Sequence, residues 1–162
     1  MQKKITYGGL GCALCVLLLL GASYLPTLKA ALLFLASVMP YVVFRVTDVK
    51  IAFAMYGATS ILAFLTCQSG SPAIVASFII CFGNYPIFMA IVDRFGFWIR
   101  NIAKFALYTI YFFGIYIIFT RVLLLPVPYS PYLFFGVGAI VFYIYDCLIV
   151  QTGDYLMQRM KL

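Results

Sequence analysis

The chain has 162 residues, of which 66% are hydrophobic and only 9% are charged, and its formal net charge is +7. A soluble domain of this size exposes much of its surface and has no place to bury so much apolar area. Barrel strands alternate apolar and polar residues, whereas the apolar segments here are apolar on all sides. The composition therefore predicts an all-α integral membrane protein with a single transmembrane domain.

The inventory of polar residues narrows the function. The chain has no histidine and no glutamate, and its acids are Asp48, Asp93, Asp146 and Asp154. Membrane hydrolases normally need histidine or a carboxylate cluster as base or metal ligand. We therefore expect no enzymatic activity, no metal and no cofactor. The basic residues lie at the ends of apolar segments, where they set topology, so the positive charge does not indicate nucleic-acid binding.

Six apolar stretches approach the roughly 20 residues that a helix needs to cross a bilayer. No small-residue cleavage pattern follows the first stretch, so we expect it to remain as a helix. The second and third are short, which favours tilt or partial burial. The predicted spans are residues 7–24, 28–44, 51–67, 73–92, 102–125 and 132–150, followed by a short polar tail.

Lysine and arginine are distributed unevenly between the connections. With a cytoplasmic amino terminus, nine of these residues fall on the inner side, and only Lys29 and Arg121 fall outside. Inner loops of membrane proteins are enriched in Lys and Arg. Both termini are therefore predicted to be cytoplasmic, an inference that depends on an even number of spans.

Small residues gather near the cytoplasmic end of the first span and recur in the third. Small residues one turn apart let another helix approach closely, and that helix belongs either to this chain or to a partner. Within this set, Cys12-Ala-Leu-Cys15 has a C-x-x-C spacing but no second pair and no histidine, so helix packing is the favoured interpretation. The pairs four apart are Gly8–Cys12, Gly9–Ala13, Gly11–Cys15 and Ala54–Ala58.

The fourth span is interrupted by Gly83-Asn-Tyr-Pro86. A proline inside a helix removes a backbone donor and clashes with the carbonyl one turn earlier. In lipid, the freed carbonyl must find a partner inside the protein or in a wet cavity. The Asn84 amide at the same depth is expected to face the bundle interior. The segment predicts a kinked helix turned toward a cavity or toward another helix.

The connection Asp93–Lys104 mixes aromatic and basic residues, which is typical of an anchor at the cytoplasmic headgroups or of a docking surface. In the last span, Asp146 needs a partner, either a cation such as Arg100 or Lys104, a ligand, or a proton. Arg121 is placed either to meet an anionic substrate or to reach headgroups, and tyrosines can line a pocket for a flat organic ligand. The candidate ligand-binding residues are Asn84, Tyr85, Arg121, Asp146, Tyr24 and Tyr129.

Phe82-Gly-Asn-Tyr-Pro-Ile-Phe88, Asp93-Arg94 and Tyr145-Asp146 resemble segments of small membrane proteins from Gram-positive anaerobes. Those proteins are similar to the substrate-binding (S) subunits of energy-coupling factor transporters. The resemblance spans nearly the whole chain and implies an S-component-like bundle in the bacterial cytoplasmic membrane. It also implies a vitamin-like ligand captured from outside, with a transmembrane coupling subunit and ATPase subunits as partners.

The S-subunit family docks through an alanine pair four apart in the first helix. The matching positions here are Gly9 and Ala13, so the pattern is met only loosely. Without histidine, an organic micronutrient fits better than nickel or cobalt. The alternative is a scaffold without transport, similar to rod-shape proteins of the MreD type. Such a scaffold would hold partner proteins through the small-residue faces, including Ala54–Ala58, and through the Asp93–Lys104 connection.

Overall fold

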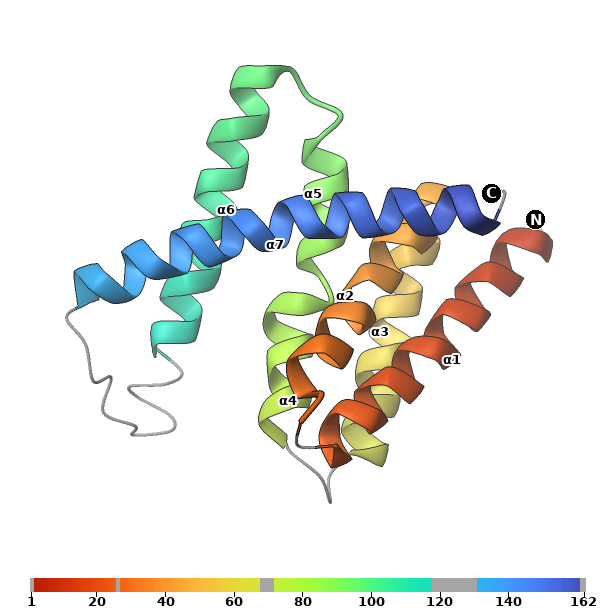
Figure 1. Cartoon of the computed structure of the whole chain (residues 1–162). Helices are drawn as coiled ribbons and strands as arrows, with labels where there is room; N and C mark the ends of the chain where they lie inside the picture. Colours follow the sequence, from red (N-terminus) through yellow and green to blue (C-terminus); the bar gives the residue numbers. More distant parts are fainter. Residues whose placement is uncertain (1, 26, 68–71, 118–130, 161–162) are drawn as a thin grey trace. The chain divides into compact units, whose positions relative to one another are not determined.

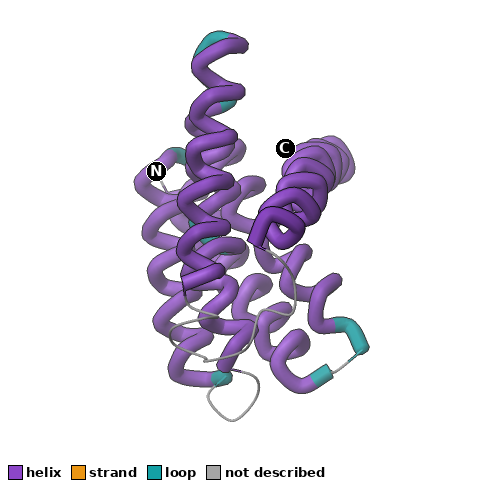
Figure 2. Tube along the Cα trace, turned by 90° about the vertical axis from the view of Figure 1, so that its left-hand side faces the viewer, coloured by secondary structure: helices purple, strands orange, loops and turns teal. Residues whose placement is uncertain are grey.

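The computed structural model describes residues 2–25, 27–67, 72–117 and 131–160. Every regular element in these ranges is helical (Figure 2). In chain order (Figure 1) they are α1 (Gln2–Tyr24), α2 (Lys29–Val46), α3 (Val49–Thr66), α4 (Pro72–Ser77), the π-helical turn η1 (Phe78–Phe82), α5 (Tyr85–Val92), α6 (Phe97–Ile117) and α7 (Pro131–Met160).

The all-helical class is confirmed, and five stretches of the described chain are long and apolar enough to cross a membrane. They are Gln2–Tyr24, Lys29–Val46, Val49–Thr66, Ile74–Val92 and Gly136–Arg159. The predicted span 102–125 overlaps α6, and its last residues lie outside the described ranges. These helices indicate a multi-pass membrane protein, while the predicted fifth span, residues 102–125, and the orientation of the termini stay predictions.

Two helices include residues that were expected to form a polar tail or a connection. The last helix continues past residue 150 to Met160, so the stretch expected to be a polar tail is helical. Earlier in the chain, α6 already begins at Phe97, inside the stretch expected to link the fourth and fifth spans. At the start of α6 and at the end of α7, polar residues are therefore part of a helix, which hydropathy alone does not reveal.

The chain forms two compact units. The first comprises Met1–Ile91 together with Ile149–Leu162, and the second comprises Val92–Leu148. In the first unit, α1 packs against both α2 and α3, and the α4–η1 segment packs against the three-helix group (Figure 1). Its interior is apolar, and the largest fully buried side chains include Leu19, Phe78 and Ile87.

Two glycines of α1 allow close helix packing inside the first unit. A Cβ atom on Gly11 would lie 2.7 Å from Val43 Cγ2, and one on Gly8 would lie 2.9 Å from Ile51 Cγ2. Only hydrogen fits at these two positions without moving the neighbouring side chain. Gly9, on the other side of α1, has open space where a Cβ atom would be.

The end of α7 packs on the end of α2 within the first unit. Gly153 lies under the Tyr41 ring, where a Cβ atom would come within 2.5 Å of Tyr41 Cδ1. One residue further, the Asp154 carboxylate is 3.8 Å from the Arg45 guanidinium. This contact gives the helical continuation beyond residue 150 a packing partner that the sequence pattern did not show.

In the second unit, aromatic rings join α6 to α7. Tyr108 and Phe112 of α6 both pack on Phe142 of α7, with ring centroids 5.4 and 6.4 Å apart, respectively. The Phe112 ring lies against Gly138 of α7, where no larger residue would fit. Aromatic pairs of this kind add to the free energy of apolar burial, so the cluster stabilises the pairing of the two helices.

The first prediction separates the two faces of α1. We expect Gly11→Val to lower the free energy of unfolding by about 1–3 kcal/mol, because the added side chain collides with Val43. Gly9→Val is the matched control, since it makes the same change in helix propensity on an open face. Chemical denaturation in detergent micelles measures both. Equal stability of the two variants would contradict the packing described here.

Candidate functional site

The fourth candidate span is broken rather than only kinked. In η1, the Gly83 N–H donates to the Phe78 carbonyl oxygen, five residues back, at 2.8 Å, instead of four residues back as in an α-helix. Gly83 and Asn84 then form a turn, and α5 begins at Tyr85. Pro86 therefore lies in the first turn of a new helix, where its missing N–H needs no partner.

Asn84 occupies the position that caps α5. Its backbone carbonyl accepts hydrogen bonds from the N–H groups of Ile87, at 3.1 Å, and Phe88, at 3.2 Å. Asparagine is among the residues preferred at a helix amino terminus, and proline is common in the first helical turn. The Asn84–Pro86 sequence is thus a helix-start signal, which the expectation of one kinked helix overlooked.

Tyr56 of α3 supplies a donor to the backbone at this break. Its hydroxyl donates to the Ile79 carbonyl oxygen at 2.6 Å. That carbonyl is the one that Gly83 N–H would bond in an uninterrupted α-helix. Within a bilayer such a group must be satisfied by the protein, and a side chain of the neighbouring helix does so here.

Gly83 makes the approach of Tyr56 possible. A Cβ atom at this position would lie 2.7 Å from Tyr56 Cε2 and 2.9 Å from Phe78 Cε1. The tyrosine ring therefore rests directly on the glycine backbone, and its hydroxyl reaches the Ile79 carbonyl beyond it. Contact between the Tyr56 and Phe78 rings, 6.3 Å between centroids, completes the arrangement.

A second helix interruption is repaired in the same way. Pro40 lies inside α2 and lacks the N–H that would bond the Ala36 carbonyl. The thiol of Cys15 in α1 donates to that carbonyl, with 3.2 Å between sulfur and oxygen, and both residues are fully buried. Cys15 thus donates a hydrogen bond where α1 packs on α2, and the helix-packing interpretation of the Cys12–Cys15 pair stays a prediction. Cys12 accepts a hydrogen bond from Thr59 of α3 at 3.4 Å.

The candidate ligand-binding residues are not gathered in one unit. Asn84 is half-buried, Tyr85 is 2% exposed and Tyr24 is exposed at the end of α1, all three in the first unit. Asp146 belongs to the second unit. Arg121 and Tyr129 lie outside the described residues. Ligand binding by this set stays a prediction.

Asp146 takes part in a bridged ion pair inside the second unit. Lys104 Nζ lies 3.0 Å from Asp146 Oδ2 and 3.0 Å from Asp93 Oδ1, with side chains 24%, 15% and 30% exposed, respectively. An ionisable group at membrane depth is expected to find such a partner. Of the alternatives weighed for Asp146, the structural ion pair is therefore present, and Lys104 is the cation.

The small residues proposed for docking face outward. Gly9, Ala13, Ala54 and Ala58 are all exposed in the described chain. The neighbouring Gly8, Gly11 and Cys15 form the buried face of α1 instead. Helices α1 and α3 therefore each pack internally through one face and expose small residues on another.

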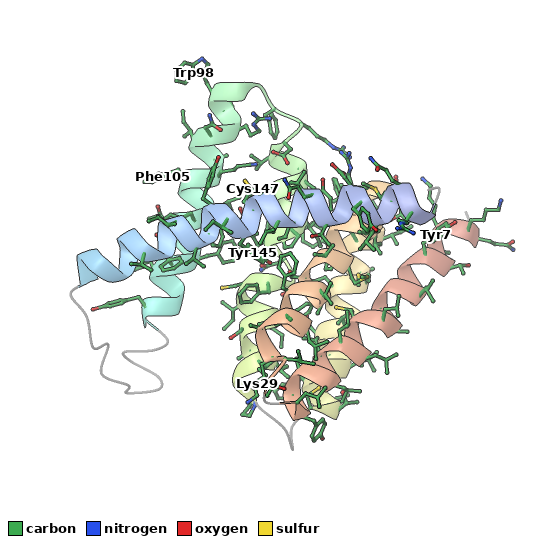
Figure 3. All side chains as sticks on the ribbon, in the orientation of Figure 1. Tyr7, Lys29, Trp98, Phe105, Tyr145 and Cys147 are labelled. Carbon is green, nitrogen blue, oxygen red and sulfur yellow. The ribbon has the colours of Figure 1, made fainter. Side chains whose placement is uncertain are left out.

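The aromatic residues at the start of α6 also point outward. Trp98 is 78% exposed, and its side chain extends away from α6 (Figure 3). Phe105, further along the same helix, is also exposed. Phe95, just before the helix, is exposed as well. These positions suit both interpretations of the segment, as an anchor at the headgroups or as a docking surface.

Comparison with protein-family models, with curated proteins and with solved structures gives no match. Within the described residues, no group of three or more His, Cys, Asp or Glu side chains is placed to hold a metal ion.

The hydrogen bond of Cys15 gives a test with a matched control. We expect Cys15→Ala to lower the free energy of unfolding by about 1–2 kcal/mol, because the buried Ala36 carbonyl loses its donor. Cys15→Ser keeps a donor of similar size and should retain most of the stability. Unfolding curves in detergent measure both. If serine and alanine destabilise equally, the thiol does not serve the carbonyl.

The bridged ion pair gives another test. Lys104→Met should destabilise the second unit by roughly 2–4 kcal/mol, because it leaves two largely buried carboxylates next to each other without their shared cation. Adding Asp93→Asn and Asp146→Asn to this variant removes the charge and should restore most of the loss. Unfolding monitored at Trp98 provides the measurement. A triple variant as unstable as Lys104→Met alone would contradict an electrostatic cause.

Proposed function

We propose that this protein is the substrate-binding membrane subunit of an energy-coupling factor type transporter. It captures a vitamin-like organic micronutrient from outside the bacterial cytoplasmic membrane. Separate ATPase subunits and a transmembrane coupling subunit then drive release to the inside. The chain itself supplies binding and docking, without catalysis.

The observation that supports docking is the open face of α1. Gly9 and Ala13 are exposed one turn apart, while the buried face of the same helix uses other small residues. In lipid, helices associate where small residues let their backbones come close. A coupling helix laid along Gly9 and Ala13 would find this close approach, at the positions that correspond to the docking pair of S subunits.

A scaffold of the MreD type is the second candidate, and two contacts favour it. Tyr85 is packed in the interior with 2% of its surface exposed, and Asp146 is engaged by Lys104. In this arrangement, neither side chain is presented to a solute. A scaffold needs only the outward small-residue faces, and these serve a partner equally well in either candidate function.

Co-purification tests the proposal most directly. We expect the chain, expressed in lipid together with the host's coupling and ATPase subunits, to be recovered as a complex. Gly9→Leu and Ala13→Leu should each lower the recovered complex at least about tenfold, because a leucine keeps helix backbones apart. Ala106→Leu, at an exposed alanine of α6, is the control and should leave recovery unchanged.

A thermal-shift series against vitamins then separates the two candidates. A specific stabilisation that is lost in Asn84→Ala supports solute capture. Recovery without the ATPase, but with a cell-wall synthesis or division protein, together with no stabilising vitamin, contradicts the transporter and supports the scaffold.

A further inference from the structure

The broken fourth span contains a helical turn with two possible hydrogen-bond registers. In the structure, Gly83 N–H bonds the Phe78 carbonyl and the Tyr56 hydroxyl bonds the Ile79 carbonyl. We propose that η1 is a conformational switch. The hydrogen bond from Tyr56 holds the π register, and loss of this bond lets the turn become α-helical. This inference does not rest on the proposed function.

The two registers use almost the same backbone bonds. In the α register, Gly83 N–H moves from the Phe78 carbonyl to the Ile79 carbonyl, so no backbone donor is lost. Tyr56 is then displaced from the oxygen it now holds. The hydroxyl bond and the ring contacts of Tyr56 are made only in the π register, and a protein with two such states can shift between them.

Pro86 keeps the switch local. A continuous α-helix through residues 72–92 would bring the proline ring against the carbonyl four residues earlier. The break at Asn84 is therefore present in both registers, and the exchange of backbone hydrogen bonds is confined to the turn before it. Isolated π-turns within helices are frequently found at functional sites.

The switch turns α5 about its own axis. Removing the extra residue of a π-turn rotates the following helix by roughly 100° and shifts it by about 1.5 Å. In the present register Tyr85 and Ile87 are buried, and the Phe88 ring meets the Phe53 ring edge to face at 5.6 Å. The rotation would carry Tyr85 out of the interior and separate the Phe53 and Phe88 rings.

Gly83 and Tyr56 act on the same hydrogen bond to the Ile79 carbonyl, so the effects of substituting them on the ratio of the two registers should not be additive. Tyr56→Phe removes only the hydroxyl. Gly83→Ala places a methyl group where the Tyr56 ring lies and therefore lifts the ring away. Each change is expected to release the Ile79 carbonyl to Gly83 N–H, and the second change then has nothing further to release.

The test uses a single 4-trifluoromethylphenylalanine at position 88 and ¹⁹F NMR of the full chain in lipid nanodiscs. The wild-type protein should show a major resonance for the π register and a minor one for the α register. We expect Tyr56→Phe to raise the ratio of the minor to the major resonance about fivefold, which is the population change that corresponds to the net free energy of one hydrogen bond. Gly83→Ala should raise the ratio similarly, and the double variant no more than the larger single effect.

Two controls keep the result interpretable. Tyr143→Phe removes a hydroxyl from an exposed tyrosine of α7 and should leave the ratio unchanged. Phe53→Ala should shift only the major resonance, because the Phe53 ring is near position 88 only in the π register. An unchanged ratio in both Tyr56→Phe and Gly83→Ala overturns the proposal, and so does a full additive effect in the double variant.

Discussion

Within a bilayer, no water is present to hydrogen-bond a backbone carbonyl that has lost its helical donor, so the protein must provide another donor. The first unit meets this constraint twice. The Ala36 carbonyl, left open by Pro40, accepts the Cys15 thiol, and the Ile79 carbonyl, left open by the π-turn, accepts the Tyr56 hydroxyl. Each repair comes from a different helix, so each interruption also ties two helices together.

Close packing follows from the same constraint. A thiol or a phenol reaches a neighbouring backbone only if the helices lie near enough, and glycine permits this at the critical places. Gly11 lets α1 approach Val43 of α2, and α2 is also the helix whose Ala36 carbonyl accepts the Cys15 thiol. Gly83 lets the Tyr56 ring lie directly on the backbone of the turn. The exposed pair Gly9 and Ala13 plays no part in these repairs. That face of α1 is exposed, and it is the face on which the proposed function places a docking partner.

Much of the fold could be predicted from the sequence, because apolar stretches and their punctuation are local signals. The first three spans were located to within a few residues of α1, α2 and α3, apart from the start of α1 at Gln2. The interruption at Gly83–Pro86 was also located, and Lys104 was among the cations considered for Asp146. Each of these predictions depends on residues close in sequence or on a simple charge requirement.

The remaining features depend on contacts between segments far apart in the chain. The helical continuation of α7 is supported by Tyr41 and Arg45 of α2, and the donor for Ile79 comes from α3. No periodicity within either segment indicates such a partner. A proline does, however, identify the carbonyl four residues earlier as one that needs a donor, and this signal was available for Pro40 and Ala36.

The central claim is that neighbouring side chains satisfy the carbonyls freed at the two helix interruptions. Its most direct test is the ¹³C chemical shift of the Ala36 and Ile79 carbonyls, measured by solid-state NMR in lipid bilayers. We expect Cys15→Ala to move the Ala36 signal upfield and Tyr56→Phe to move the Ile79 signal of the π register upfield, each leaving the other carbonyl unchanged. Carbonyl shifts that do not respond to either substitution would contradict the account.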